Sequence, residues 1–236
     1  KYLQLGGMGM IIPTYSEFDI SSKILQEIVN DIITKDIIKR YNIRTKTVFI
    51  KLTDFIFNEL GKRISNKNLE NFLVSKKEEV VNQKTILKFF SYLCNSLMLC
   101  DVVFFNIKGK EKLVTKTKYY AGDLGIANVY KGFDIEKDFG YRLENLVYLE
   151  LLSRDYEVYT SLDRNELEVD FVAKKGNEIK YVQVCKELNN ENYERESKSL
   201  LKIKDGYEKI IISYENNVSP KLDGIKQVNL CEWLLE

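Results

Sequence analysis

Residues 166–185, ELEVDFVAKKGNEIKYVQVC, are the basis for the predicted fold class. It holds two runs rich in β-branched and aromatic residues, with Gly176-Asn177 between them, which predicts two strands joined by a turn. Side chains alternate between the two faces of a strand. Asp170 is therefore expected on the face opposite Val169 and Phe171. Gln183 is expected to share a face with its neighbours two residues away, Tyr181 and Cys185.

Helices and further strands are predicted on both sides of this pair of strands. Before it, helical periodicity covers residues 140–154, and a short β-rich run covers 157–161. After it, a helix is expected at 191–204, an apolar strand at 209–214 and a final strand and helix within 224–236. The order α-β-β-β-α-β predicts an α/β (α+β) fold, with a mixed sheet flanked by helices.

The first half of the chain has mainly helical periodicity. Helices are expected from Ser21 or Ser22 to Arg40, over 46–60, from Ser65 to Leu73, and from Asn82 to Leu99. Two β-rich runs then follow, with Lys108-Gly109-Lys110 between them, a hairpin signal. Helices followed by a hairpin predict a winged helix-turn-helix at 46–118. Residues 1–45, which begin with a glycine-rich connector, would form a helical lead-in to it.

Composition excludes several kinds of chemistry. The chain of 236 residues contains no histidine, which rules out Ser-His-Asp hydrolysis, Cys-His proteolysis and histidine-ligated zinc. The four cysteines have no CxxC spacing, and they are expected to be reduced thiols of a cytoplasmic protein. No apolar run is long enough for a membrane span, and no signal peptide opens the chain.

The charge is unevenly distributed between the two halves. Residues 1–118 have 20 basic and 12 acidic side chains, whereas 119–236 have 16 and 23. A basic half is the electrostatic candidate for contact with a phosphate backbone. In a winged helix, the helix from Asn82 would enter a major groove of DNA. A winged helix can also serve as a protein–protein module, and that alternative stays open. The expected DNA contacts are Gln83, Lys84 and Lys88 on the helix and Lys108, Lys110 and Lys112 on the wing.

Three oxygen-bearing side chains of the second half form a candidate metal site. Glu144 lies on the helix expected at 140–154. Asp170 lies on the first strand expected within 166–185, and Gln183 lies on the second. Oxygen ligands suit Mg²⁺ or Mn²⁺, and such an ion can activate water for attack on a phosphate. We therefore expect a nuclease-like site, which is weak if it binds metal at all.

The sequence as a whole resembles a known family. GYRLENLVYLEL, EVYTS, EVDFVA and YVQV look like the PD-(D/E)xK nuclease-like domain at the C-terminus of predicted bacterial and archaeal AAA-type ATPases. Upstream, YLQLGGMGMI, DIITKDIIKRYNIR and KYYAGDLGIANV are similar to that family's post-ATPase linker, helical segment and junction. The resemblance implies a restriction-endonuclease-like domain at 119–236. It also implies an ATPase domain before Lys1, since the chain itself contains no GxxxxGK[ST].

The resemblance also assigns roles to four residues. Glu144 and Asp170 match the helix and strand carboxylates of these nucleases, Gln183 stands at the position of a second acidic ligand, and Cys185 stands at the position of the catalytic lysine. A glutamine lacks the ligand charge, and a neutral thiol cannot stabilise a phosphate as an ammonium does. The expected function is DNA binding coupled to an upstream ATPase, with a degenerate nuclease-like site. The alternatives are an active metal-dependent DNA endonuclease and a protein-interaction module of a defence or toxin-like system.

Overall fold

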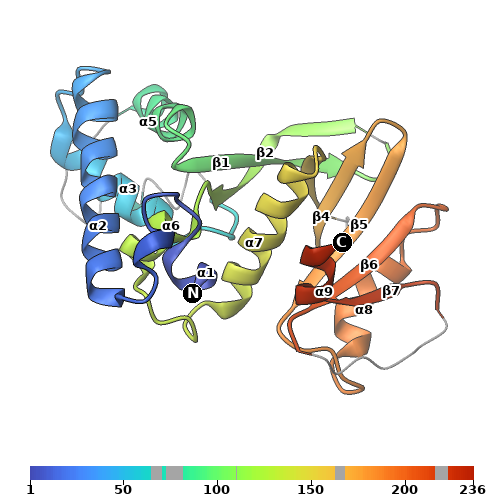
Figure 1. Cartoon of the computed structure of the whole chain (residues 1–236). Coiled ribbons are helices and arrows are strands. Elements are labelled where there is room, and N and C mark those ends of the chain that lie inside the picture. Colours follow the sequence, from blue (N-terminus) through green and yellow to red (C-terminus); the bar gives the residue numbers. More distant parts are fainter. Residues whose placement is uncertain (65–70, 73–81, 110, 163–167, 216–222) are drawn as a thin grey trace. The chain divides into compact units, whose positions relative to one another are not determined.

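A computed structural model describes most of the chain, as two compact units. The described residues are 1–64, 71–72, 82–109, 111–162, 168–215 and 223–236, and in 113–116 and 162 only the backbone is described. Unit 1 comprises 1–101 and 118–137, and unit 2 comprises 102–117 and 138–236. The predicted helix from Ser65 to Leu73 falls almost entirely outside the described residues. Figure 1 follows the elements along the chain.

Unit 1 is built mainly from helices. They are α1 (Tyr2–Leu5), η1 (Ile12–Thr14), α2 (Phe18–Asp31), η2 (Ile32–Lys39), α3 (Lys46–Asn58), α5 (Gln83–Asn95) and α6 (Leu124–Lys131). The helix predicted from Ser21 or Ser22 to Arg40 is present, but it begins at Phe18, and its second part, η2, is a π-helix. The glycine-rich connector expected at the start of residues 1–45 contains two short helices, α1 and η1.

Individual residues explain where several of these helices begin and end. Asn42 has φ +51°, a left-handed conformation that asparagine tolerates, and it follows the lead-in helix. Asn82 is the N-cap of α5, and its side chain accepts a hydrogen bond from the Thr85 amide at 2.9 Å. Helix α5 ends at Asn95, four residues before the predicted end. The chain turns at Leu97, which has φ +59°, and strand β1 begins at Leu99.

Unit 2 contains a mixed sheet covered by helices. Its helices are α7 (Phe139–Ser153), α8 (Tyr193–Leu201) and α9 (Leu230–Leu235). In the described ranges the sheet has seven strands in the order β2-β1-β3-β4-β5-β6-β7. They are β1 (Leu99–Asn106), β2 (Glu111–Ala121), β3 (Glu157–Leu162), β4 (Glu168–Lys175), β5 (Glu178–Cys185), β6 (Glu208–Ser213) and β7 (Lys226–Asn229). The predicted α+β class with a mixed sheet is confirmed.

The predicted hairpin is part of this sheet. β3, β4 and β5 pair antiparallel, whereas β5, β6 and β7 pair parallel. β1 pairs in parallel with β3 through Phe104↔Thr160. Hairpin residues 102–117 consequently belong to unit 2, while the first three residues of β1 and the last four of β2 belong to unit 1.

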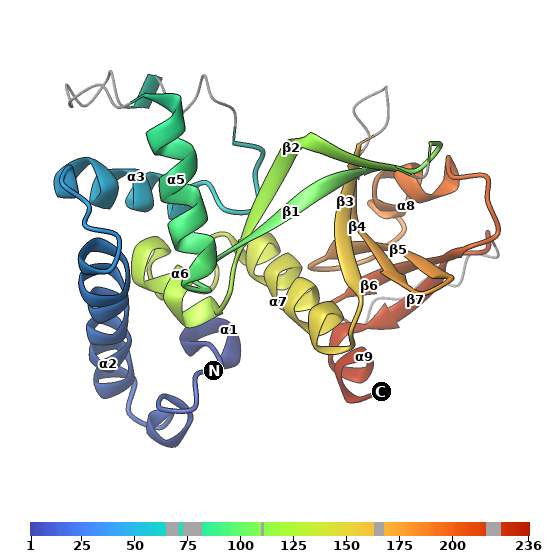
Figure 2. The ribbon, with the colours of Figure 1, turned by 90° about the horizontal axis from the view of Figure 1, so that it is seen from above.

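Helices α7 and α8 cover opposite faces of the sheet (Figure 2). Phe171 of β4 lies against Tyr148 of α7, with ring centroids 6.1 Å apart. Its neighbour Val172 belongs to a core cluster with Tyr181 of β5 and Tyr193 of α8. Consecutive strand residues point to opposite faces, so α7 packs on one face and α8 on the other.

The strict alternation predicted for β4 is wrong at one point. The pairing of β3 with β4 shifts register between Tyr159↔Val172 and Ser161↔Val169. Two residues of β4, Asp170 and Phe171, therefore lie opposite the single residue Thr160, which is the arrangement of a β-bulge. In agreement, Val169 and Val172 belong to the same core cluster, although regular alternation would separate them. The face of Asp170 consequently cannot be read from its position in the strand.

Candidate functional site

The exposed face of α5 carries the predicted DNA contacts. Ile86, Phe89, Phe90 and Leu93 are buried and fix the opposite face of the helix to the core of unit 1. Gln83, Lys84 and Lys88 are all exposed. Helix α5 contains no Asp or Glu, and Leu87, between the two lysines in the sequence, is 56% exposed. This surface is thus cationic with an apolar centre.

The three predicted wing lysines differ from one another. Lys108 is exposed in the turn that follows β1. Lys112 is exposed on β2, but its ammonium lies 3.4 Å from a carboxylate oxygen of Glu157 and 4.9 Å from the Tyr159 ring centroid. Lys110 lies outside the described residues. Lys108 is therefore better placed than Lys112 to meet a phosphate, because Lys112 would first have to leave Glu157.

Asp170 lies where β4 and β5 stop pairing through their main chains. The ladder between them runs from Lys175↔Glu178 to Phe171↔Val182. One residue further, the Asp170 side chain takes over: its Oδ2 accepts the Val184 N–H at 2.8 Å. Asp170 is only 7% exposed. One carboxylate oxygen is thus already used to hold the neighbouring strand.

Gln183 and Cys185 lie on the α8 side of β5. Cys185 belongs to the same core cluster as Tyr181, and Gln183 lies between them with the same two-residue period. The Gln183 Oε1 atom is buried and accepts no hydrogen bond from any described residue. A buried acceptor without a donor is unfavourable, so this oxygen suits a water molecule or a cation.

The Cys185 thiol is neutral at physiological pH. Burial, together with the charges of Glu196 and Asp170, raises its pKa to about 12. Glu196 of α8 is a neighbour that sequence reasoning missed: its side chain is 11% exposed and pairs with Arg195 at 2.6 Å. Its signal was the motif Glu194-Arg195-Glu196 on the helix after β5. Two acidic residues, Glu196 and Asp170, and the cation Arg195 thus lie near the position where the resemblance expects a lysine.

Glu144 is half-buried on α7, the helix that covers the other face of the sheet. Lys186, the residue after Cys185, has its ammonium 5.2 Å from the ring centroid of Phe139, at the start of α7. Lys186 therefore lies on the α7 side, as alternation predicts, and does not replace Cys185 on the α8 side. The predicted set is distributed over both faces of the sheet.

The donors fit a divalent ion only in part. Across the described ranges, no three Asp, Glu or Cys side chains form a group that could hold a metal. The predicted set contains two carboxylates, of which Asp170 already holds Val184, and one neutral amide. The negative charge of the ligands largely determines the affinity for Mg²⁺ and Ca²⁺, so this set predicts weak binding of a divalent ion.

Two motifs far apart in the sequence pack together in unit 1, at what we call the Asp123 junction: Leu3 to Gly7 with Asp123, Gly125 and Asn128. The Asp123 carboxylate caps α6 by accepting the Gly125 N–H at 2.7 Å, and it also accepts the Gly7 N–H at 2.8 Å. The Asn128 amide donates to the Leu3 and Gln4 carbonyls at 2.9 and 2.8 Å. The junction thus joins YLQLGGMGMI to KYYAGDLGIANV.

Close backbone contact makes glycine necessary at this junction. A Cβ on Gly125 would lie 2.4 Å from the Leu5 carbonyl oxygen. Gly6 has φ +75°, and a Cβ there would lie 2.0 Å from the Asp123 carboxylate. Burial raises the pKa of Asp123, while the N–H donors of Gly7, Gly125 and Ile126 lower it, and burial is the larger effect. The glycines were the sequence signal, but only the structure shows that they pack on one another.

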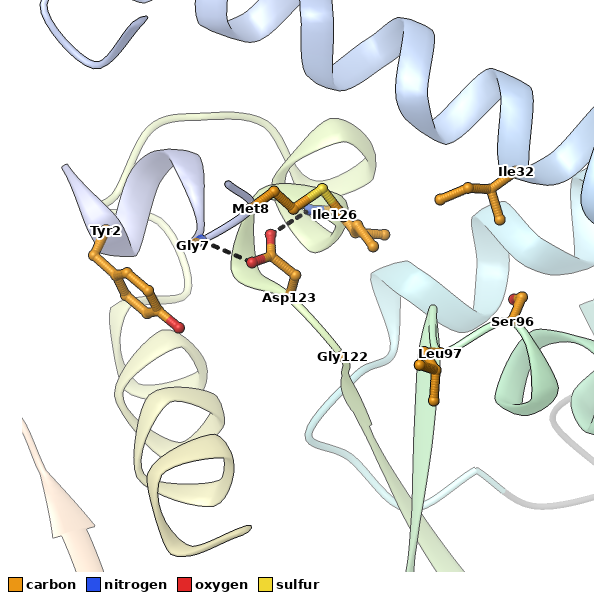
Figure 3. A pocket seen from close by; sticks show the side chains of 9 residues that line it. All are labelled: Tyr2, Gly7, Met8, Ile32, Ser96, Leu97, Gly122, Asp123 and Ile126. Carbon is orange, nitrogen blue, oxygen red and sulfur yellow. Dashed lines mark hydrogen bonds between the residues drawn. The ribbon is translucent and has the colours of Figure 1, made fainter. Parts of the chain in front are cut away.

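A pocket of about 360 Å³ lies beside the Asp123 junction (Figure 3). Its lining is mostly apolar: Tyr2, Gly7, Met8, Ile32, Ser96, Leu97, Gly122, Asp123 and Ile126. The Asp123 oxygens point to the backbone N–H groups of Gly7 and the start of α6 (Figure 3). The carboxylate therefore positions the N-terminal segment, and the chemistry left to the pocket is chiefly apolar contact.

Comparison with known proteins finds relatives that are described as uncharacterised. An uncharacterised protein of Haemophilus influenzae is 31% identical over 239 residues, covering 100% of this chain and 57% of the relative. The uncharacterised protein MJ1544 of Methanocaldococcus jannaschii is 31% identical over 209 residues, covering 87% of this chain and 46% of the relative. The chain thus spans about half the length of these curated relatives. No solved structure matches it.

No helix in the described part of the chain is both long and apolar enough to cross a bilayer. A family model, the domain of unknown function DUF8612, matches residues 1–137. The end of the match coincides with Lys137, the last residue of unit 1. By this match over more than half of its length, the chain belongs to the DUF8612 family.

Proposed function

We propose that this chain binds DNA through unit 1, with α5 as the helix that enters the major groove. The observation that carries this proposal is the exposed face of α5, where Lys84 and Lys88 lie one helical turn apart without any acidic neighbour on the helix. Two cations at this spacing can contact the phosphates that border a groove, and Gln83 can hydrogen-bond a base edge. The wing expected from the sequence, the β1–β2 hairpin with Lys108, lies mostly in unit 2, so the proposal for unit 1 rests on α5.

The chain would act as part of a larger ATPase. The resemblance of its motifs to the C-terminal region of AAA-type ATPases supports this part of the proposal, as does a length of about half that of its relatives. The Asp123 junction would then hold the segment nearest the ATPase domain against α6. A movement of that segment would be transmitted to α6 through these hydrogen bonds rather than through a flexible linker.

The nuclease-like unit would serve in binding or assembly rather than in cleavage. Cys185 is neutral where an ammonium is needed, and burial with the charges of Glu196 and Asp170 raises the pKa of its thiol. Gln183 supplies no charge to a metal ion. These three features disfavour transition-state stabilisation on a phosphate. The Asp170 carboxylate could bind Mg²⁺ or Mn²⁺ weakly if the buried Gln183 oxygen turned toward it.

A binding titration tests the DNA-binding proposal. The chain and a labelled DNA duplex are mixed over a series of NaCl concentrations, and fluorescence anisotropy gives the affinity. We expect the logarithm of the affinity to fall linearly with the logarithm of salt concentration, because phosphate contacts release counterions. An affinity that stays constant between low and moderate salt would contradict phosphate contact, and it would favour the protein-interaction alternative.

A further inference from the structure

A second basic surface lies next to α5, on the segment that joins the lead-in helix to α3. Between Asp36 and Asp54 the chain has five basic residues and no acidic one. Between Glu79 and Asp101 it has two basic residues and again no acidic one. The exposed cations of these two segments are Lys39, Arg40, Arg44, Lys46, Lys84 and Lys88. Both segments therefore have the charge that suits a phosphate backbone.

Two tyrosines connect the segments. The rings of Tyr41 and Tyr92 are stacked, with centroids 3.8 Å apart and planes inclined by 10°. Tyr92 is on α5, four residues after Lys88, so it lies one turn along the same side of the helix. Both tyrosines are half-buried. The stacked pair thus lies where the two basic segments meet.

The fold holds this pair in place from both sides. The Asn95 amide donates to the Tyr41 hydroxyl at 3.4 Å, and Phe89 packs behind Tyr92 at 6.4 Å between ring centroids. Phe89 in turn lies 5.1 Å from Phe49 in the core. An aromatic series therefore runs from the core to the surface and ends at Tyr41. Its orientation is fixed before any ligand arrives, which lowers the entropic cost of binding.

An exposed cation, Arg40, lies near the Tyr41 ring. The guanidinium carbon of Arg40 lies 5.9 Å from the ring centroid, near the limit for a cation–π contact. Arg40 is exposed, so it can exchange this contact for a phosphate at little cost. A flat ring could then take the place of Arg40 beside Tyr41. The π-helix η2 and the left-handed Asn42 place these residues at the end of the lead-in helix.

We infer that Tyr41 and Tyr92 form a stacking platform for an unpaired base of a DNA strand, with the surrounding cations on its phosphates. Base–aromatic stacking beside a basic groove is the chemistry by which proteins bind single strands without sequence preference. The inference rests on the proposed DNA binding and deepens it. It states that unit 1 engages DNA where a duplex has opened or ended, with Lys88 shared between the duplex contact and the platform.

An abasic strand separates stacking from charge. The full chain is titrated by anisotropy with labelled oligothymidine and with an abasic strand of equal length. We expect tighter binding to oligothymidine. Tyr41→Leu should weaken binding to oligothymidine by about 5- to 150-fold and leave the affinity for the abasic strand unchanged. Tyr41→Phe should keep the preference, because it keeps the aromatic face. Tyr214→Leu is the matched control, since Tyr214 is a 40% exposed tyrosine of unit 2 that also packs against an aromatic ring.

The outcomes distinguish the two proposals. If the duplex is still bound, two results would overturn the stacking platform alone. One is equal affinity for the oligothymidine and the abasic strand. The other is a preference for oligothymidine that persists in Tyr41→Leu, with thermal unfolding showing that this variant is folded. Failure to bind duplex or single strands at low salt would overturn the proposed DNA binding and the platform with it.

Discussion

Replacement of Asp123 tests the Asp123 junction. In Asp123→Ala, helix α6 loses its N-cap, which costs about 0.5–2 kcal/mol. The Gly7 N–H, which donates to Asp123 at 2.8 Å, is also left without its acceptor, which costs about 1–3 kcal/mol for a group shielded from water. The two contributions together predict a decrease of about 1.5–5 kcal/mol in the free energy of unfolding of unit 1. Urea denaturation followed by far-ultraviolet circular dichroism measures it.

Two controls make this measurement specific. Asp134→Ala removes an exposed aspartate of the same unit and should change the free energy of unfolding by less than about 0.5 kcal/mol. Trp233 is the single tryptophan, and its fluorescence reports on unit 2 in the same sample. A decrease below about 0.5 kcal/mol in Asp123→Ala, equal to that in Asp134→Ala, would refute the reasoning that the junction stabilises unit 1.

Three further predictions concern acidity, reactivity and cleavage. Because burial raises the pKa of Asp123 above its ordinary 3.8, the folded state binds the carboxyl proton more tightly than the unfolded state. The free energy of unfolding should therefore fall as pH rises from 3.8 through the raised pKa. Asp123→Asn should lack that fall. With iodoacetamide at mildly alkaline pH, mass spectrometry should find the exposed Cys231 modified well before Cys185, whose pKa is about 12; equal rates would show that the Cys185 thiol is accessible and acidic. Incubation with linear or branched DNA and Mn²⁺ should give no cleavage products, whereas products that disappear in Asp170→Ala would establish an active metal-dependent nuclease.

The sequence was sufficient to predict most elements because their signals are local. Helical periodicity indicated α3, α5, α7 and α8, and the β-rich runs indicated β1 to β6, with ends mostly within a few residues. The predicted start of α5 at Asn82 is a short-range signal, and the structure has Asn82 as the N-cap of that helix. Lys84 and Lys88 are exposed because the opposite side of their helix is apolar, which periodicity also shows.

Features that depend on distant contacts could not be predicted in this way. The bulge at Asp170 and Phe171 arises from pairing with β3, and no local pattern in β4 reveals it. Gly6 and Gly125 are 119 residues apart, and their need for glycine comes from a close approach that only the fold creates. Likewise, Tyr41 and Tyr92 stack across two helical segments, and neither stands out in its own neighbourhood.

The salt dependence of DNA binding by a Lys84→Gln/Lys88→Gln double variant is the sharpest test of DNA binding through α5. Removal of one phosphate-binding cation should reduce the slope of log affinity against log salt by about 0.9, so the double variant should have a slope smaller by about 2. The matched control is Lys198→Gln/Lys202→Gln, which removes the same charge at the same spacing from exposed positions on and just after α8 in unit 2. We expect the slope to fall only in the α5 variant; an unchanged slope there, or an equal fall in both variants, would contradict DNA binding through α5.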